Sequence, residues 1–77
     1  MFSPVYWSGL GNVFMKLNKY EYAIECFNKN IVLNKTYDES VYINRGICYL
    51  NLKDNLSALY DFKLVLQRNI FNYEACH

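Results

Sequence analysis

The residues that could carry out catalytic chemistry are few in this chain of 77 residues. Three cysteines, Cys26, Cys48 and Cys76, are present, and the single histidine, His77, supplies with Cys76 at most half of a metal site. The cysteine spacings suit neither a disulfide framework nor paired zinc ligands. No cysteine has a histidine or carboxylate at a motif spacing, and no glycine-rich phosphate loop occurs. We therefore expect no enzyme, no cofactor and no metal, with reduced and buried thiols.

The charged residues point to no acidic or basic partner. Eight basic and seven acidic residues give a net charge of +1 without a like-charge block. Nucleic acids and anionic membranes are bound largely through clustered Lys and Arg, so we expect neither as a partner. Three carboxylates, Asp61, Glu21 and Glu25, are interpreted as parts of solvated helix surfaces.

The composition indicates a folded protein without a membrane span. Hydrophobic residues make up 53% of the chain and aromatic residues 18%, which requires a packed core. No apolar run reaches the roughly 18 residues that a transmembrane helix needs. The first residues, Met1-Phe2-Ser3-Pro4, show no basic region followed by an apolar segment. We expect no secretory signal and a cytoplasmic location.

Apolar residues recur at helical spacing, and no segment alternates as a strand would. The pattern predicts four helices, at about residues 4–17, 20–33, 39–52 and 56–68. Ser3 and Asp38 are predicted to cap the first and third helices, and Asn18 to end the first in a left-handed conformation. Tyr37 and Tyr42 have the spacing of a hydrophobic staple. Residues 69–72 are interpreted as a connector.

The second half of the chain repeats the first at a period of thirty-five residues. The matching pairs are Trp7 and Tyr42, Gly11 and Gly46, Phe14 and Tyr49, Ala23 and Ala58, and Phe27 and Phe62. A glycine inside a helix costs about 1 kcal/mol relative to alanine, so two equivalent glycines predict that a bulky side chain approaches the backbone there. A period of this length is typical of stacked helical hairpins.

These residues resemble the tetratricopeptide repeat family. The first unit carries the pattern in Trp7, Leu10, Gly11, Phe14, Tyr20, Ala23 and Phe27, and the second in Tyr42, Gly46, Tyr49, Ala58 and Phe62. In the second unit Arg45 replaces the leucine and Asn55 the tyrosine. The family's late alanine is replaced by Asn30 and Val65, and its late proline by Lys35 and Ile70.

The resemblance implies an all-α fold in which antiparallel helix hairpins stack as a right-handed solenoid of four helices. It implies one domain over residues 1–77, with repeats at about 4–38 and 39–72 and the start of a third helical unit at 73–77. It also implies a non-catalytic scaffold or adaptor that binds a peptide or partner helix in a concave groove. Carried over position by position, the groove residues are Val5, Ser8, Asn12, Met15, Lys16, Ser40, Ile43, Asn44, Ile47, Leu50 and Asn51.

The groove positions of the second unit include an apolar stripe. Ile43, Ile47 and Leu50 recur at helical spacing about 100° around the helix from Tyr42 and Tyr49. Such a doubled apolar face is wider than one partner helix needs. It predicts a seat for an amphipathic helix or an extended peptide, or else a surface that a neighbouring repeat or the chain's own ends cover.

Some members of the family grip a partner's terminal carboxylate with lysine, asparagine and arginine side chains. Asn12 and the segment Tyr42-Ile43-Asn44-Arg45 match part of that set, whereas Ser8 stands in the place of the first lysine. Without that lysine the charge-assisted grip is weak on its own.

Two other functions stay open at this point. A thirty-five-residue period also belongs to pentatricopeptide arrays, which read single-stranded RNA, although the near-neutral charge and the glycine, alanine and phenylalanine set count against that function. The other is structural assembly or homo-oligomerisation through an exposed repeat end, since repeat arrays need about three units to cover their apolar faces. Alternatively, the chain is a piece of a longer array, and a further repeat covers its exposed apolar face.

Overall fold

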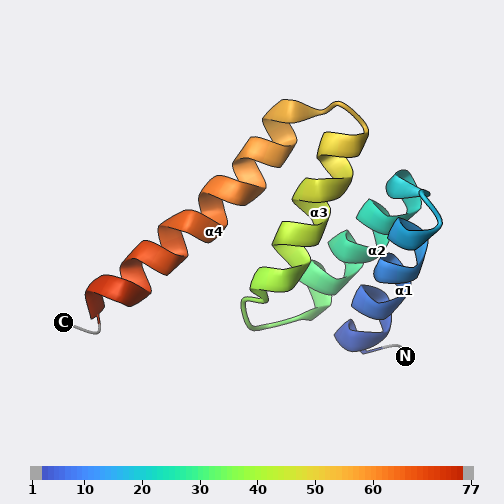
Figure 1. The fold of residues 1–77 in the computed structure, drawn as a ribbon. Helices are drawn as coiled ribbons and strands as arrows, with labels where there is room; N and C mark the ends of the chain where they lie inside the picture. Colours follow the sequence, from blue (N-terminus) through green and yellow to red (C-terminus); the bar gives the residue numbers. More distant parts are fainter. Residues whose placement is uncertain (1–2, 76–77) are drawn as a thin grey trace.

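The protein folds into two helix hairpins. A computed structural model describes the backbone of residues 3–75 and the side chains of residues 3–68. Its helices are α1 (Pro4–Lys16), α2 (Tyr20–Leu33), α3 (Glu39–Asn51) and α4 (Asn55–Ala75). Helices α1 and α2 form the first antiparallel hairpin and α3 and α4 the second (Figure 1). The predicted all-α class is confirmed, and residues 3–75 contain no strand.

Predicted capping residues begin two of the helices. Ser3 Oγ accepts a hydrogen bond of 3.4 Å from the amide of Tyr6 at the start of α1, and Asp38 Oδ1 accepts one of 3.1 Å from Ser40 at the start of α3. The predicted staple also forms, because the rings of Tyr37 and Tyr42 stack with their centroids 5.4 Å apart. These local contacts fix the angle at which the chain enters α3.

Helices α1 and α3 end in the same way, thirty-five residues apart. Asn18 has a φ of 61° and Lys53 a φ of 65°, so both adopt the left-handed conformation. In each case the next residue donates its N–H to a carbonyl five residues earlier, at 2.8 Å after α1 and 2.9 Å after α3. This is the Schellman termination, which satisfies carbonyls at a helix end. The prediction for Asn18 is confirmed, and Lys53 adopts the same conformation despite its Cβ.

Helix α4 corrects the predicted boundaries at the end of the chain. It continues without a break from Asn55 to Ala75, so the connector predicted at residues 69–72 is wrong and residues 73–75 are part of α4. No glycine or proline lies in this helix, and a helical asparagine costs at most about 0.7 kcal/mol relative to alanine. Asn69 and Asn72 are therefore too weak a signal to end a helix. Residues 76–77 lie outside the described residues.

A glycine faces a phenylalanine ring inside each hairpin. A Cβ on Gly11 would lie 2.6 Å from Cε1 of Phe27, and a Cβ on Gly46 would lie 2.9 Å from Cε1 of Phe62. Real Cβ atoms do not approach other heavy atoms that closely. The predicted close approach is confirmed in both hairpins, with Phe27 rather than Phe14 as the neighbour of Gly11.

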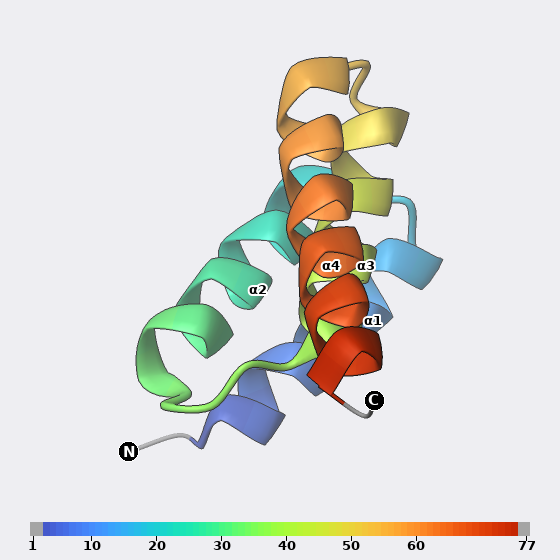
Figure 2. The same cartoon turned by 90° about the vertical axis from the view of Figure 1, so that its left-hand side faces the viewer.

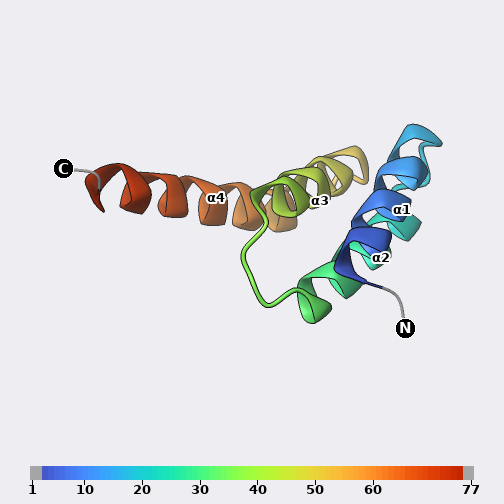
Figure 3. The same cartoon turned by 90° about the horizontal axis from the view of Figure 1, so that it is seen from below.

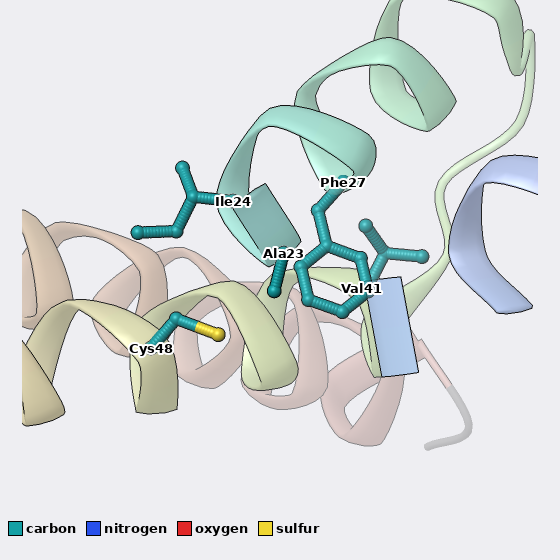
Figure 4. Packing of buried hydrophobic residues seen from close by; sticks show 5 residues of the cluster. All are labelled: Ala23, Ile24, Phe27, Val41 and Cys48. Carbon is teal, nitrogen blue, oxygen red and sulfur yellow. The ribbon is translucent and has the colours of Figure 1, made fainter. Parts of the chain in front are cut away.

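The core lies between the hairpins as well as within them. Its buried residues come from the second helix of one hairpin and the first helix of the next: Ala23, Ile24, Phe27, Val41 and Cys48 (Figure 4). Figure 2 and Figure 3 show the second hairpin stacked on the first at α2 and α3, and in Figure 3 the end of α4 projects beyond the other helices. The resulting body is flat and elongated, with extents of 41 × 32 × 17 Å.

Two further contacts join elements that are distant in sequence. Asn30, which replaces the family's late alanine, is buried and donates from Nδ2 to the backbone oxygen of Pro4 at 2.6 Å. The guanidinium carbon of Arg68 lies 4.2 Å from the ring centroid of Tyr37, which connects α4 to the segment between the hairpins. The hydrogen bond satisfies a buried amide, as polar groups in a core require.

The glycine contact gives a stability prediction with an internal control. In Gly11→Ala the new methyl group must displace the buried Phe27 ring, which costs about 1–3 kcal/mol and outweighs the gain in helix propensity. Gly9 lies in the same helix with nothing within 4 Å of its Cβ position, so Gly9→Ala should raise the free energy of unfolding by up to about 1 kcal/mol. Urea unfolding followed by circular dichroism measures both. Equal effects of the two substitutions would contradict the packing argument.

Candidate functional site

The first helices of the two hairpins are linked through their side chains. Asn44 on α3 donates from Nδ2 to Oδ1 of Asn12 on α1 at 3.0 Å. An asparagine side chain has two donor hydrogens and an acceptor oxygen, so each amide keeps hydrogen-bonding capacity beyond this bond. The structure thus brings together two of the predicted groove residues that are thirty-two positions apart in sequence.

Apolar side chains lie beside this amide pair, mainly on α3. Ile47 is 36% exposed and Leu50 is 49% exposed, while Ile43 is half-buried. On α1 the exposed apolar groove residue is Val5. We name as the α1/α3 face the residues Val5, Asn12, Ile43, Asn44, Ile47 and Leu50. It offers a predominantly apolar surface on α3 next to amide groups that reach both helices.

The other predicted groove residues lie in different surroundings. Met15 is half-buried and packs against the core cluster, so it stabilises the fold in addition to any surface role. Ser8 Oγ donates to Val5 O at 3.1 Å and Asn51 Nδ2 donates to Ile47 O at 2.9 Å, so both polar groups are bonded within their own helices. The remaining two, Lys16 and Ser40, are exposed.

Arg45 belongs to a buried ion pair with α4. Its Nε donates to Oδ2 of Asp61 at 2.9 Å and its Nη2 donates to Oδ1 at 2.6 Å, in a bidentate arrangement. Its Nη1 also donates to Oδ1 of Asn28 on α2 at 2.8 Å, across the junction between the hairpins. The rings of Tyr42 and Tyr49 lie within 6 Å of the guanidinium carbon. This arginine is therefore occupied in packing the repeats, which counts against its use in a carboxylate grip.

The interpretation of Asp61 as part of a solvated helix surface is wrong. Asp61 is fully buried, and the hydrogen bonds that Arg45 donates to it raise the pKa of the Arg45 guanidinium. In the first hairpin the equivalent positions are Leu10 and Cys26, which line the same hollow. Both positions change from apolar to oppositely charged between the two units. That paired change was the sequence signal that could have predicted this contact.

The ion pair gives a prediction that compares the two hairpins directly. Asp61→Ala leaves the guanidinium of Arg45, whose side chain is only 15% exposed, without its anion. It should lower the free energy of unfolding by about 3 kcal/mol, the lower end of the range for fully buried pairs. The double variant Arg45→Leu with Asp61→Cys transplants the apolar pair of the first hairpin and should recover most of that loss, because buried ion pairs can often be replaced by apolar residues.

Chemical unfolding of the wild type, Arg45→Leu, Asp61→Cys and the double variant measures the coupling free energy of the pair, and Asp61→Ala is measured beside them. If the double variant is as unstable as Asp61→Ala, then Leu and Cys cannot replace Arg45 and Asp61 as they occur at positions 10 and 26 of the first hairpin.

Two of the three cysteines lie in the described part of the chain. Cys26 and Cys48 are both free thiols and buried, as predicted, whereas Cys76 and His77 lie outside the described residues. Burial raises the pKa of Cys48 from its ordinary 9.0 to about 11. Burial, followed by the charge of Glu25, also raises the pKa of Cys26, and Lys29 opposes that shift. Both thiols therefore stay protonated near neutral pH, whereas the nucleophile in cysteine chemistry is the thiolate.

The pKa of Cys48 predicts a pH dependence of stability. The folded protein holds this proton more tightly than the unfolded chain, so the stabilisation is complete below about pH 9 and is lost as the pH rises towards 11. The difference in free energy of unfolding between the wild type and Cys48→Ala should therefore narrow over that range. Chemical unfolding at a series of pH values tests this, and a constant difference would contradict it.

Two of the hollows among the described residues lie away from the α1/α3 face. One of about 210 Å³ lies on the side of the first hairpin and is lined by Trp7, Leu10, Phe14, Tyr22, Glu25, Cys26 and Lys29. The other, of about 200 Å³, lies at the connector between the hairpins. The described residues contain no cluster of metal-binding side chains, and no helix among them is long and apolar enough to cross a bilayer.

These features define a helical-repeat protein, in which equivalent hairpins stack through equivalent faces. A family model described as Tetratricopeptide repeat matches residues 4–37, which contain α1 and α2, so the first hairpin is similar to a tetratricopeptide repeat. The second hairpin repeats its glycine contact, its left-handed helix end and its packing. No curated protein and no solved structure matches the chain. Tetratricopeptide repeats generally mediate protein–protein interactions.

Proposed function

We propose that the protein is a non-catalytic interaction module that binds an apolar segment of another protein on its α1/α3 face. The observation that carries this proposal is the exposure of Ile47 and Leu50 beside the amide pair of Asn12 and Asn44. Apolar side chains of a partner would lie against the two α3 residues. The amides would hydrogen-bond polar groups of the partner, either side chains of an amphipathic helix or the backbone of an extended peptide.

The match to the tetratricopeptide repeat supports a protein partner over single-stranded RNA. Three of the cations support the same choice, because Arg45 is bonded to Asp61 while Arg68 and Lys29 lie against aromatic rings. Binding of single strands needs cationic grooves along the backbone together with exposed stacking platforms. A terminal carboxylate has no arginine to meet on the α1/α3 face, so we propose recognition through apolar side chains.

A selection of peptides tests the proposal. Panning a phage library of random peptides against the protein should enrich sequences with apolar residues at helical or alternating spacing. Amide chemical-shift changes on adding a selected peptide should concentrate at Asn12, Ile43, Ile47 and Leu50. Shift changes confined to the hollow around Trp7, or no enrichment at all, would contradict the proposed site.

The matched variants are Ile47→Asp and Val32→Asp. Ile47→Asp places a charge in the apolar surface and should weaken the selected peptides by at least about tenfold while the helix content stays unchanged. Val32 is 84% exposed on α2 and lies outside the α1/α3 face, so Val32→Asp should bind as the wild type does. If Ile47→Asp instead loses its helix content, the stripe is a structural surface and the proposal for it is wrong.

A further inference from the structure

The junction between the two hairpins is a template for a second, intermolecular junction. At the junction Ile24 of α2 packs with Val41 and Cys48 of α3, and all three are buried (Figure 4). Each of these residues has an equivalent thirty-five positions away in the other hairpin. The exposure of those equivalents shows which surfaces the first junction leaves uncovered.

One uncovered surface lies on α4. Leu59 is the equivalent of Ile24, and it is 54% exposed where Ile24 is 9% exposed. Leu66 is the equivalent of Ile31, and it too is exposed whereas Ile31 packs against the core cluster. We call Leu59 and Leu66 the α4 end. Its residues are apolar like Ile24 and Ile31 on α2, but in the described structure both are more than half exposed.

The other uncovered surface lies on α1. Val13 is the equivalent of Cys48, and it is 52% exposed where Cys48 is fully buried. Tyr6 is the equivalent of Val41 and is likewise exposed. We call Tyr6 and Val13, with the adjoining hollow around Leu10, the α1 end. Val13 and Tyr6 thus occupy the positions that Cys48 and Val41 occupy in the second hairpin, where both are buried at the junction.

We propose that the α4 end of one molecule docks on the α1 end of a second copy, in the register by which the first hairpin packs on the second. In that register Leu59 takes the place of Ile24 against Val13 of the other copy. Because the two surfaces differ, the contact is heterologous and leaves a free surface at each end of the dimer. The assembly therefore grows by addition of further copies and does not close as a symmetric pair. It goes beyond the binding of a partner on the α1/α3 face and does not depend on it.

The charges at the two ends suit this pairing. Lys63 is the equivalent of Asn28, which accepts a hydrogen bond from Arg45 at the internal junction. The place of Arg45 is taken at the α1 end by Leu10, and Glu25 lies beside Leu10 in the same hollow. The stem of Lys63 can pack on Leu10 while its ammonium group approaches the carboxylate of Glu25. The Asn28 contact is not reproduced, so this junction is weaker than the internal one.

Two variants, each blocking one end, test the proposal. In sedimentation experiments the mean mass of the wild-type 77-residue chain should rise with concentration beyond that of a dimer. Val13→Asp blocks the α1 end and Leu59→Asp blocks the α4 end, and each should weaken association by at least about thirtyfold. Mixed together, they retain one matching pair of ends and should form a dimer that does not grow.

Several results would overturn the proposal. They are a wild-type chain that stays monomeric throughout, single variants that associate like the wild type, and a mixture that gives no dimer. A wild-type mass that levels off at that of a dimer would indicate a symmetric pair and would also overturn the proposal. Val32→Asp serves as the control and should associate as the wild type does. If circular dichroism shows either blocking variant to be unfolded, Val13→Lys and Leu66→Asp replace them. Both blocking positions lie outside the α1/α3 face, so peptide binding is retained and the two proposals fail separately.

Discussion

The contact between a helix backbone and a phenylalanine ring is the constraint on which the structure depends. At Gly11 and Gly46 the absence of a side chain allows the rings of Phe27 and Phe62 to lie where a Cβ would be. Each glycine lowers the intrinsic stability of its helix, and ring burial against the backbone offsets that cost. Because the contact occurs twice at equivalent positions, the two hairpins share the same close approach of their helices. The first then packs its α2 against α3 of the second through Ile24, Val41 and Cys48.

Much of this arrangement was predictable because its causes are local and occur twice. The left-handed helix end at Asn18, the caps at Ser3 and Asp38 and the twin glycines each depend on a few neighbouring residues. The length of α4 was not predicted, since an asparagine in a helix is only slightly unfavourable and gives a weak stop signal. The burial of Asp61 depends on Arg45, which is sixteen positions away on another helix. Helical periodicity alone does not detect such a pair.

The groove residues divide into those that the fold uses and those that it leaves for contacts. Met15 packs against the core, and Ser8 and Asn51 are bonded to their own helices, so position in the repeat does not by itself establish a binding role. Asn12, Asn44, Ile47 and Leu50 stay the best candidates because they are accessible and differ in chemistry between α1 and α3. A partner lying across both helices would meet the Asn12 amide on α1 and the Asn44 amide with the aliphatic Ile47 and Leu50 on α3. That difference gives the surface a direction.

The hydrogen bond from Arg45 to Asn28 also bears on the order of the two hairpins along the chain. The buried residues at this junction are apolar and would tolerate many neighbours. The bond needs an acceptor on the preceding hairpin and an arginine on the following one, and Leu10 cannot take the place of that arginine. A chain with the two hairpins exchanged would keep every helix and both glycine contacts but would lose this bond. The two units are therefore alike in shape but not interchangeable, and polar contacts between the hairpins distinguish the first from the second.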